Sequence, residues 1–138
     1  MQSHLRNNLK YWLPVGFYCA AIFIQSAYPS MKQLSDVPYG DKYLHMLGYA
    51  ILGSLFYRAF RSLYFQDRLL PAILLSIAAS TGYGISDEFH QYFVPYRSAD
   101  IMDVLADMVG SCIGVMAYFL IMERFDIFPK HSWIDKLR

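Results

Sequence analysis

The stretch LLPAILLSIAASTGYGIS, from Leu69 to Ser86, is 18 residues long and contains no charged side chain. A helix that crosses the hydrocarbon core of a bilayer needs about 20 mostly apolar residues. Pro71 falls in the first turn of such a helix, where its missing backbone N–H leaves no helical hydrogen bond unmade. The stretch therefore predicts a membrane-spanning helix that begins at Leu69.

Three more stretches of the 138-residue chain have the same character, and Pro14 is expected in the first turn of the first one. Together the four predicted spans cover residues 11–28, 42–60, 69–92 and 100–122. Short connections join them, and neither an internal repeat nor a second domain is visible in residues 1–138. We therefore predict a single-domain, all-α integral membrane protein, built as a bundle of four transmembrane helices.

Composition supports a membrane protein and excludes a nucleic-acid partner. Hydrophobic residues make up 56% of the chain and charged residues 17%, whereas soluble domains have about a quarter charged residues. The net charge is +1, and no basic stripe with interleaved aromatic residues follows the chain. Cys19 and Cys112 lie in apolar runs without a metal-binding spacing, and we interpret them as small helix residues. The expected partners are membrane lipids.

The distribution of Lys and Arg predicts the orientation of the bundle, because cytoplasmic loops carry an excess of these residues. Nine lie in the N-terminal tail, the second connection and the C-terminal tail, and three lie on the other side. We therefore predict a multi-pass protein of the bacterial inner or plasma membrane with both termini in the cytoplasm. The tail Glu123 to Arg138 mixes apolar and charged residues, and either lies along the inner membrane surface or is an ordinary chain end.

Unusual polar residues gather at the outward ends of three predicted helices. Pairs such as Asp41 and His45, or Asp103 and Asp107, are spaced i, i+4 and share a helix face. Ionisable groups at membrane depth normally face the bundle interior and find partners there. We therefore predict an outward-facing polar pocket. Its expected members are Lys42, His45, Asp87, Glu88, Gln91, Arg97, Asp103 and Asp107.

The residue types suggest a division of roles in this pocket. His45 and Glu88, with Asp87 and Asp103 beside them, are the candidates for acid–base catalysis, because a pocket can bring such groups toward a neutral pKa. The candidates for substrate binding are Lys42, Gln91, Arg97 and Asp107. Arg97 either pairs with an acid of the pocket or binds an external phosphate or carboxylate. Several of these side chains are metal-ligand types, but no spacing demands an ion, and we assign neither a metal nor a cofactor.

Some of these features also have a purely structural interpretation. Asp41 and Asp100 are well placed to cap the N-termini of helices. Gly110 and Gly114 form a G-x-x-x-G pattern that lets another helix approach closely. We favour packing inside the bundle for this pattern, and a homodimer through the same face is the alternative.

The polar segments resemble the motifs of the VanZ-like family. Asp41-Lys42-Tyr43-Leu44-His45 is similar to that family's D-K-x-x-H motif. The segment from Asp87 to Ser98, DEFHQYFVPYRS, with Asp103 downstream, is similar to its D-E-x-x-Q-x-x-x-P-x-R-S pattern. The resemblance covers roughly Tyr11 to Met122. The chain departs from the family at Tyr96, where Gly is common, and at Asp107, where Asn is common.

The resemblance implies a cell-envelope protein, with a link through the namesake branch to tolerance of the glycopeptide teicoplanin. Three functional hypotheses follow from the pocket. The first is an enzyme that acts on a lipid-linked or headgroup substrate, and the second is a module that binds an envelope lipid or glycan headgroup without chemistry. The third, which the short chain favours least, is a small proton-coupled carrier.

Overall fold

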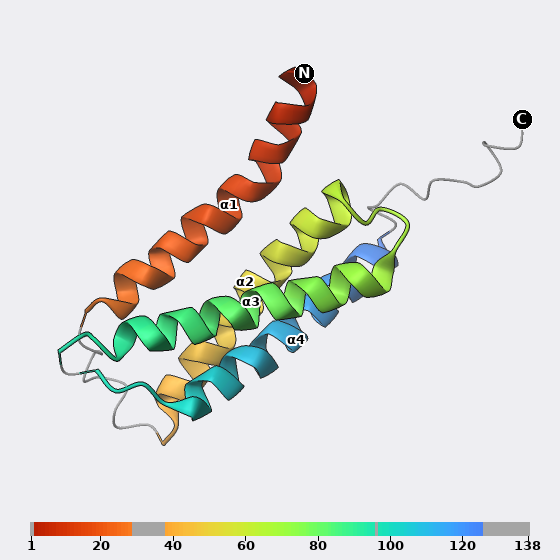
Figure 1. Ribbon diagram of the computed structural model, residues 1–138. Helices are drawn as coiled ribbons and strands as arrows, with labels where there is room; N and C mark the ends of the chain where they lie inside the picture. The colour runs from red at the N-terminus through yellow and green to blue at the C-terminus, as the bar shows by residue number, and fades with distance from the viewer. Residues whose placement is uncertain (1, 29–37, 96, 126–138) are drawn as a thin grey trace, which may run out of the picture.

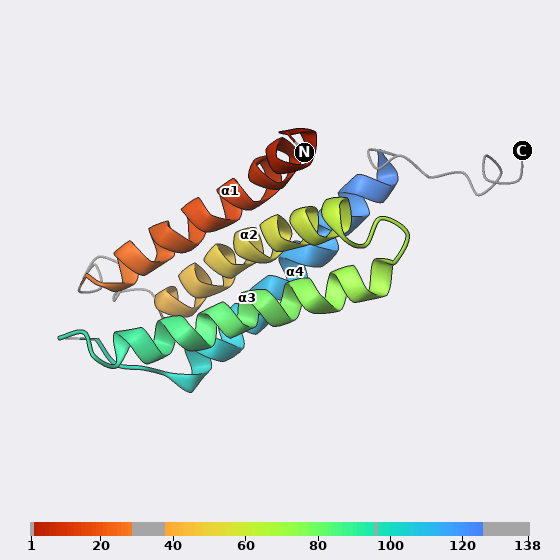
Figure 2. The ribbon, with the colours of Figure 1, turned by 45° about the horizontal axis from the view of Figure 1, so that its top comes forward.

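The four predicted helices are the four helices of the structure. The computed structural model describes residues 2–28, 38–95 and 97–125. Helices α1 (Gln2–Ser26), α2 (Gly40–Leu63), α3 (Leu69–Gln91) and α4 (Ile101–Arg124) run alternately up and down (Figure 1). Helices α2, α3 and α4 lie against one another, and α1 packs beside α2 and α3 (Figure 2). The all-helical prediction is confirmed, and the predicted C-terminal segment 126–138 lies outside the described residues.

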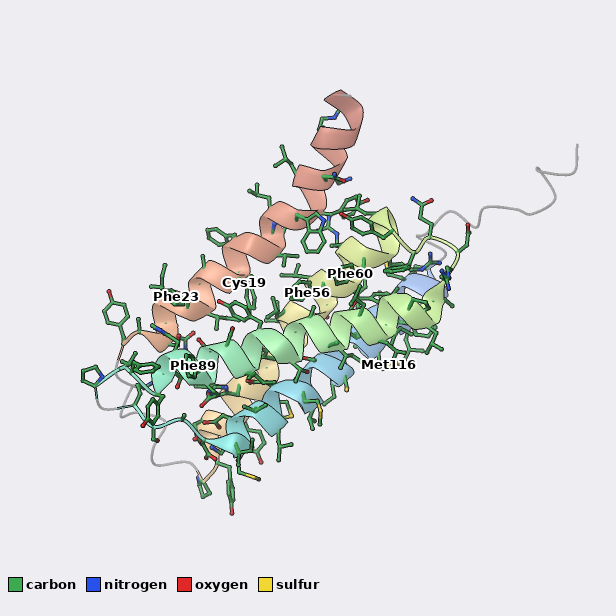
Figure 3. All side chains as sticks on the ribbon, viewed as in Figure 1. Cys19, Phe23, Phe56, Phe60, Phe89 and Met116 are labelled. Carbon is green, nitrogen blue, oxygen red and sulfur yellow. The ribbon has the colours of Figure 1, made fainter. Side chains whose placement is uncertain are left out.

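Helix α1 extends further toward the N-terminus than its predicted span. The polar residues before Tyr11 continue the helix as far as Gln2, so Pro14 lies in its interior. The prediction that Pro14 sits in a first turn is therefore wrong, whereas Pro71 does lie in the first turn of α3. Aromatic rings hold α1 to α2, because the Trp12 ring centroid lies 6.1 Å from that of Phe56 and 5.3 Å from that of Phe60. Figure 3 shows Phe56 and Phe60 on α2.

Many large apolar side chains are exposed and several acidic side chains are buried, which is the reverse of the distribution in a soluble protein. Leu13, Phe17 and Ile101 are each more than two-thirds exposed, whereas Asp107 is 0% exposed. Large apolar surfaces of this extent are rare on soluble monomers and fit a lipid environment. Among the described residues, α3 and the segment Ile101–Met122 of α4 are long and apolar enough to cross a membrane.

Helices α1 and α2 have the length of a membrane span, at 25 and 24 residues. Their sequences are less apolar than those of α3 and α4, because basic residues interrupt them, Arg6 and Lys10 in α1 and Lys42, Arg58 and Arg61 in α2. The two apolar helices indicate a membrane protein.

Glycines bring α2 and α4 into backbone contact. A Cβ atom on Gly114 would collide with the backbone of Ala50, and one on Gly110 would collide with the backbone of Met46. On the facing helix, a Cβ on Gly53 would lie 2.9 Å from the carbonyl oxygen of Ser111. The G-x-x-x-G pattern therefore packs inside the bundle, as predicted.

Replacing Gly114 should separate these two helices. We expect Gly114→Ala to lower the free energy of unfolding by about 1–3 kcal/mol, the usual cost of overpacking. Thermal unfolding in detergent micelles measures the change. Gly48→Ala is the matched control, because no atom lies within 4 Å of a Cβ at that position, and Ala is the better helix former. Equal effects of the two substitutions would contradict the close contact.

Candidate functional site

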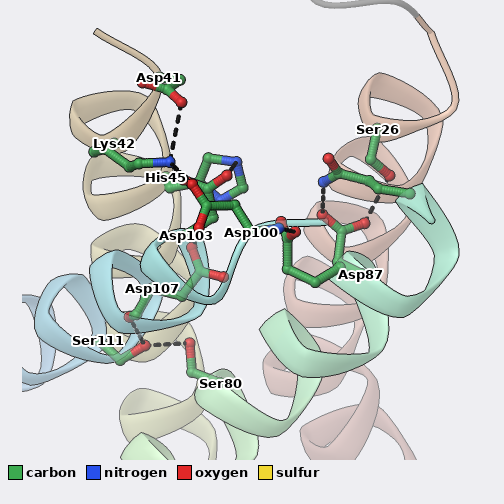
Figure 4. Close-up of polar contacts among 12 residues, drawn as sticks. Ser26, Asp41, Lys42, His45, Ser80, Asp87, Asp100, Asp103, Asp107 and Ser111 are labelled. Atoms are coloured by element: carbon green, nitrogen blue, oxygen red, sulfur yellow. Dashed lines mark hydrogen bonds and ion pairs between the residues drawn. The ribbon is translucent and has the colours of Figure 1, made fainter. Parts of the chain in front are cut away.

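The polar residues of three helices meet at the end of the bundle where α2 and α4 begin and α3 ends (Figure 4). Lys42 and His45 come from the first turns of α2, and Glu88 from the last turn of α3. Asp103 and Asp107 follow one another along α4. Glu88, Asp103 and Asp107 are buried, and the side chain of His45 is 15% exposed. We call these five residues the polar cluster.

Lys42 is held by three carboxylates. Its Nζ donates to Asp41 at 3.1 Å, to Asp100 at 2.6 Å and to Asp103 at 2.5 Å. An ammonium group has three N–H donors, so all of them are used within the protein. Asp100 precedes the apolar span of α4, and the hydrogen bond from Lys42 lowers the pKa of that carboxyl. Lys42 therefore links the starts of α2 and α4.

His45 is oriented by a carboxylate that has no exposed surface. Its Nδ1 lies 2.9 Å from Oδ1 of Asp107, and an ionised carboxylate only accepts hydrogen bonds. When Asp107 is ionised and the ring is neutral, the proton of this bond lies on Nδ1, and Nε2 has a free electron pair. Nε2 lies 4.0 Å from Oδ2 of Asp103. The ring also lies parallel to that of Tyr49, with an interplanar angle of 2°.

Small residues make room for the Asp107 carboxylate between α3 and α4. A Cβ on Gly84 would lie only 2.5 Å from Oδ2 of Asp107. One turn further along α4, the Ser111 hydroxyl lies 2.7 Å from the backbone oxygen of Asp107 and 2.8 Å from Oγ of Ser80. Oδ2 of Asp107 is buried without a hydrogen-bond partner.

Glu88 connects the end of α3 to the start of α4. Its Oε2 accepts a hydrogen bond of 2.9 Å from the backbone N–H of Asp100. Its Oε1 is buried and has no hydrogen-bond partner. Such atoms cost free energy unless a ligand or water satisfies them. One side of the Glu88 carboxylate is thus structural, and the other is available to a ligand.

Asp87 belongs to a separate network at the junction of α1 and α3. Its Oδ1 accepts from the hydroxyl of Ser26 at 2.6 Å, and its Oδ2 accepts from Nε2 of Gln91 at 3.0 Å. Ser26, Asp87 and Gln91 are all buried. The contact with Ser26 joins α1 to α3, and the contact with Gln91 lies within α3. Figure 4 shows Asp87 beside Ser26.

The remaining sequence predictions have mixed outcomes. Asp100 caps α4, because its side chain accepts from the backbone N–H of Met102, and that prediction is confirmed. The prediction for Asp41 is wrong, because α2 starts one residue earlier and Tyr39 occupies the cap position with a φ of 61°. The Arg97 guanidinium forms no ion pair with the described residues, and its Nε is buried without a hydrogen-bond partner.

Three side chains from three helices converge in a way that sequence spacing did not show. His45, Glu88 and Asp103 each offer one ligand atom, and these atoms lie within 4.8 Å of one another. No spacing along the chain demands a metal at these three residues, and none was predicted from the sequence. Ser26 and Gly84 were not predicted as neighbours of the site either, because a lone serine and a lone glycine in apolar runs carry no distinguishing signal.

Helices that expose apolar side chains and bury acidic ones between them are typical of helical membrane proteins. Within that class, residues 3–122 match the VanZ/LLP1 family. Because this match covers most of the chain, the protein belongs to the VanZ/LLP1 family. The resemblance predicted from the motifs is thereby confirmed.

A relative from the fission yeast Schizosaccharomyces pombe, "Uncharacterized protein C11E3.10", is similar in sequence. It is 27% identical over 103 residues, which cover 75% of this chain and 61% of that protein. The chain thus spans less than two-thirds of the length of this relative. No solved structure matches the chain.

The network around Asp87 makes a testable prediction. Asp87→Ala should lower the free energy of unfolding by about 1–3 kcal/mol, because it removes the acceptor of the buried Gln91 amide and the contact of Ser26 that joins α1 to α3. Ser26→Ala should have little further effect in that background, a non-additivity that a double-mutant cycle of thermal unfolding measures. Ser86→Ala, on the exposed side of α3, is the control. Additive effects of the first two substitutions would refute the network.

Proposed function

We propose that the protein is a multi-pass membrane enzyme of the cell envelope that acts on the headgroup of a lipid-linked substrate. All four helices cross the membrane in this proposal, and both termini face the cytoplasm. The alternating helix directions support it, because they put the connection 64–68 at one end of the bundle and residues 92–95 and 97–100 at the other (Figure 1). The polar cluster lies at the second end, which then faces outward.

The convergence of His45, Glu88 and Asp103 carries the proposal. Nε2 of the neutral His45 ring has a free electron pair, Oε1 of Glu88 has no hydrogen-bond partner, and Oδ2 of Asp103 lies 4.0 Å from Nε2. Basic atoms gathered in a water-poor site can activate a water molecule or a substrate hydroxyl for attack on a headgroup. Ionisable residues inside a membrane bundle are costly to bury, so a functional role explains why they are present.

The other predicted site residues take positioning roles in this proposal. Asp107 fixes the orientation of the His45 ring, as the carboxylate does in catalytic triads. Lys42 and Asp87 have their donors and acceptors engaged by protein groups, and Gln91 donates to Asp87. In this proposal the three residues hold the helix ends in register. Arg97 retains the capacity to bind an anionic part of the substrate, such as a phosphate.

Headgroup binding without chemistry is the second candidate function. The observation that favours it is the number of cluster residues whose partners already lie inside the protein, which suits a rigid binding pocket. Either function is compatible with a role in teicoplanin tolerance at a bacterial plasma membrane, because both would change which headgroups lie at the outer surface. Because the similar protein belongs to a yeast, we favour a substrate class that is not confined to bacteria.

The orientation can be tested by cysteine labelling. In a Cys19→Ser, Cys112→Ser background, Ser98→Cys should react with a membrane-impermeant maleimide in intact cells. Gln66→Cys, in the opposite connection, should react only after the membrane is permeabilised. The reverse pattern would show that the polar cluster faces the cytoplasm and would overturn the outward orientation.

The enzyme proposal predicts a selective loss of turnover. His45→Gln and Glu88→Gln should each lower turnover of an envelope lipid by about 100- to 10,000-fold, the range for acid–base groups. Mass spectrometry of lipids from expressing cells measures the accumulation of the substrate. His90→Gln is the matched control, because that ring stacks on Phe23, outside the polar cluster. Lipid profiles that do not change in folded His45→Gln protein would favour headgroup binding alone.

A further inference from the structure

The polar cluster has more negative than positive groups. Asp41, Asp100 and Asp103 surround the single ammonium of Lys42. Asp107 and Glu88 lie beside His45, and among the described residues neither carboxylate forms an ion pair with a Lys or Arg. Buried carboxylates are paired with cations or coordinate metals, because an uncompensated buried charge is costly. The excess negative charge of the cluster therefore favours the binding of a cation.

We propose that His45, Glu88 and Asp103 bind one divalent transition-metal cation, with Zn²⁺ the best-fitting ion. Imidazole nitrogen and carboxylate oxygens together suit Zn²⁺ better than they suit Mg²⁺, which prefers oxygen ligands alone. Three protein ligands with a fourth position open to water are the usual arrangement of a catalytic zinc site. The inference deepens the proposed function and rests on it for the reacting headgroup.

The distances fit this assignment. Two ligand atoms that share one tetrahedral Zn²⁺ at about 2.0–2.2 Å lie about 3.3–3.6 Å apart. Nε2 of His45 and Oδ2 of Asp103 are 4.0 Å apart, and the three ligand atoms lie within 4.8 Å of one another. Side-chain shifts of up to about 1 Å bring all three to the spacing of one ion.

Each ligand atom is free while its other end is fixed. Nδ1 of His45 is held by Asp107, which is the arrangement of a metal-bound histidine oriented by a carboxylate. Oε2 of Glu88 is held by the Asp100 amide, and the buried Oε1 is left without a partner. Oδ1 of Asp103 is held by Lys42, and Oδ2 faces His45. Each of the three residues thus has one atom fixed by the protein and a ligand atom within 4.8 Å of those of the other two.

A bound cation gives the proposed enzyme a way to activate its nucleophile. Zn²⁺ lowers the pKa of a bound water molecule to about 7, so that hydroxide forms near neutral pH. The protein groups would hold the ion, and the open position would accept water or a phosphate oxygen of the headgroup. Lys42 does not oppose the ion strongly, because Asp41 and Asp100 also compensate its charge.

Metal binding can be measured on the full-length protein purified in detergent without knowledge of the substrate. Titration with Zn²⁺ against a fluorescent competitor should give one site per chain. Glu88→Gln and Asp103→Asn should each abolish that site, and Asp107→Asn should weaken it by about 10- to 100-fold, as for groups that orient a metal-bound histidine. Asp41→Asn removes an exposed carboxylate outside the ligand set, and it should bind Zn²⁺ like the unmodified protein.

Thermal unfolding separates lost binding from lost folding. Zn²⁺ should raise the unfolding temperature of the unmodified protein and of Asp41→Asn, but not that of folded Glu88→Gln. Absorption bands in the visible range on Co²⁺ binding, absent in His45→Gln, should show the imidazole ligand. Absence of a site in the unmodified protein, or equal binding by Glu88→Gln and Asp41→Asn, would overturn the metal proposal.

The two proposals fail in different ways. Lipid turnover that persists in a chelator, with no Zn²⁺ site, would retain the enzyme and overturn the metal site. A Zn²⁺ site that needs Glu88, without any change in lipids when His45 is replaced, would retain the metal and overturn the enzyme. Mg²⁺ and Mn²⁺ titrations test the identity of the ion, and tighter binding of Mg²⁺ than of Zn²⁺ would overturn the zinc assignment.

Discussion

The carboxylate of Asp107 has no exposed surface, although the bundle exposes many large apolar side chains. The residues packed around it are those that a buried acid requires. A buried acid needs a partner and space. His45 supplies the partner at 2.9 Å, and the missing side chain of Gly84 supplies the space. Ser111, one turn further, hydrogen-bonds the Asp107 backbone and meets Ser80 of α3. Three helices thus converge on a single residue of α4.

The acidic residues divide into two groups by what their oxygen atoms touch. Asp87 has both oxygens engaged, by Ser26 and by Gln91, and it belongs to the framework. Glu88, its neighbour in sequence, has one oxygen engaged and one buried without a partner. Adjacent residues on a helix point about 100° apart, so one carboxylate faces α1 and the other faces the polar cluster. Asp87 therefore stabilises the helix packing, whereas Glu88 has a carboxylate oxygen that is free to bind a ligand.

Much of this arrangement could be predicted from the sequence, and the reasons for the exceptions are physical. Long uncharged runs locate α3 and α4 because membrane helices leave a strong compositional signal. The i, i+4 spacing placed Asp103 and Asp107 on one face of α4. The start of α2 at Gly40 and the interior position of Pro14 depend on where polar residues continue a helix, which hydrophobic runs do not show. The contact of Ser26 with Asp87 joins residues 61 apart, and only the packing of α1 reveals it.

The close-packed glycines of α4 and its acidic residues in the polar cluster lie on the same stripe of the helix. Asp103, Asp107, Gly110 and Gly114 follow at intervals of three or four residues and lie on one stripe of the helix. The glycines of this stripe meet the backbone of α2 at Met46 and Ala50. Met46 is the residue after His45, so the contact that brings the two backbones together also sets the distance from the His45 ring to Asp107. A change that moves α2 away from α4 must therefore disturb the site, even when it lies on the glycine half of the stripe.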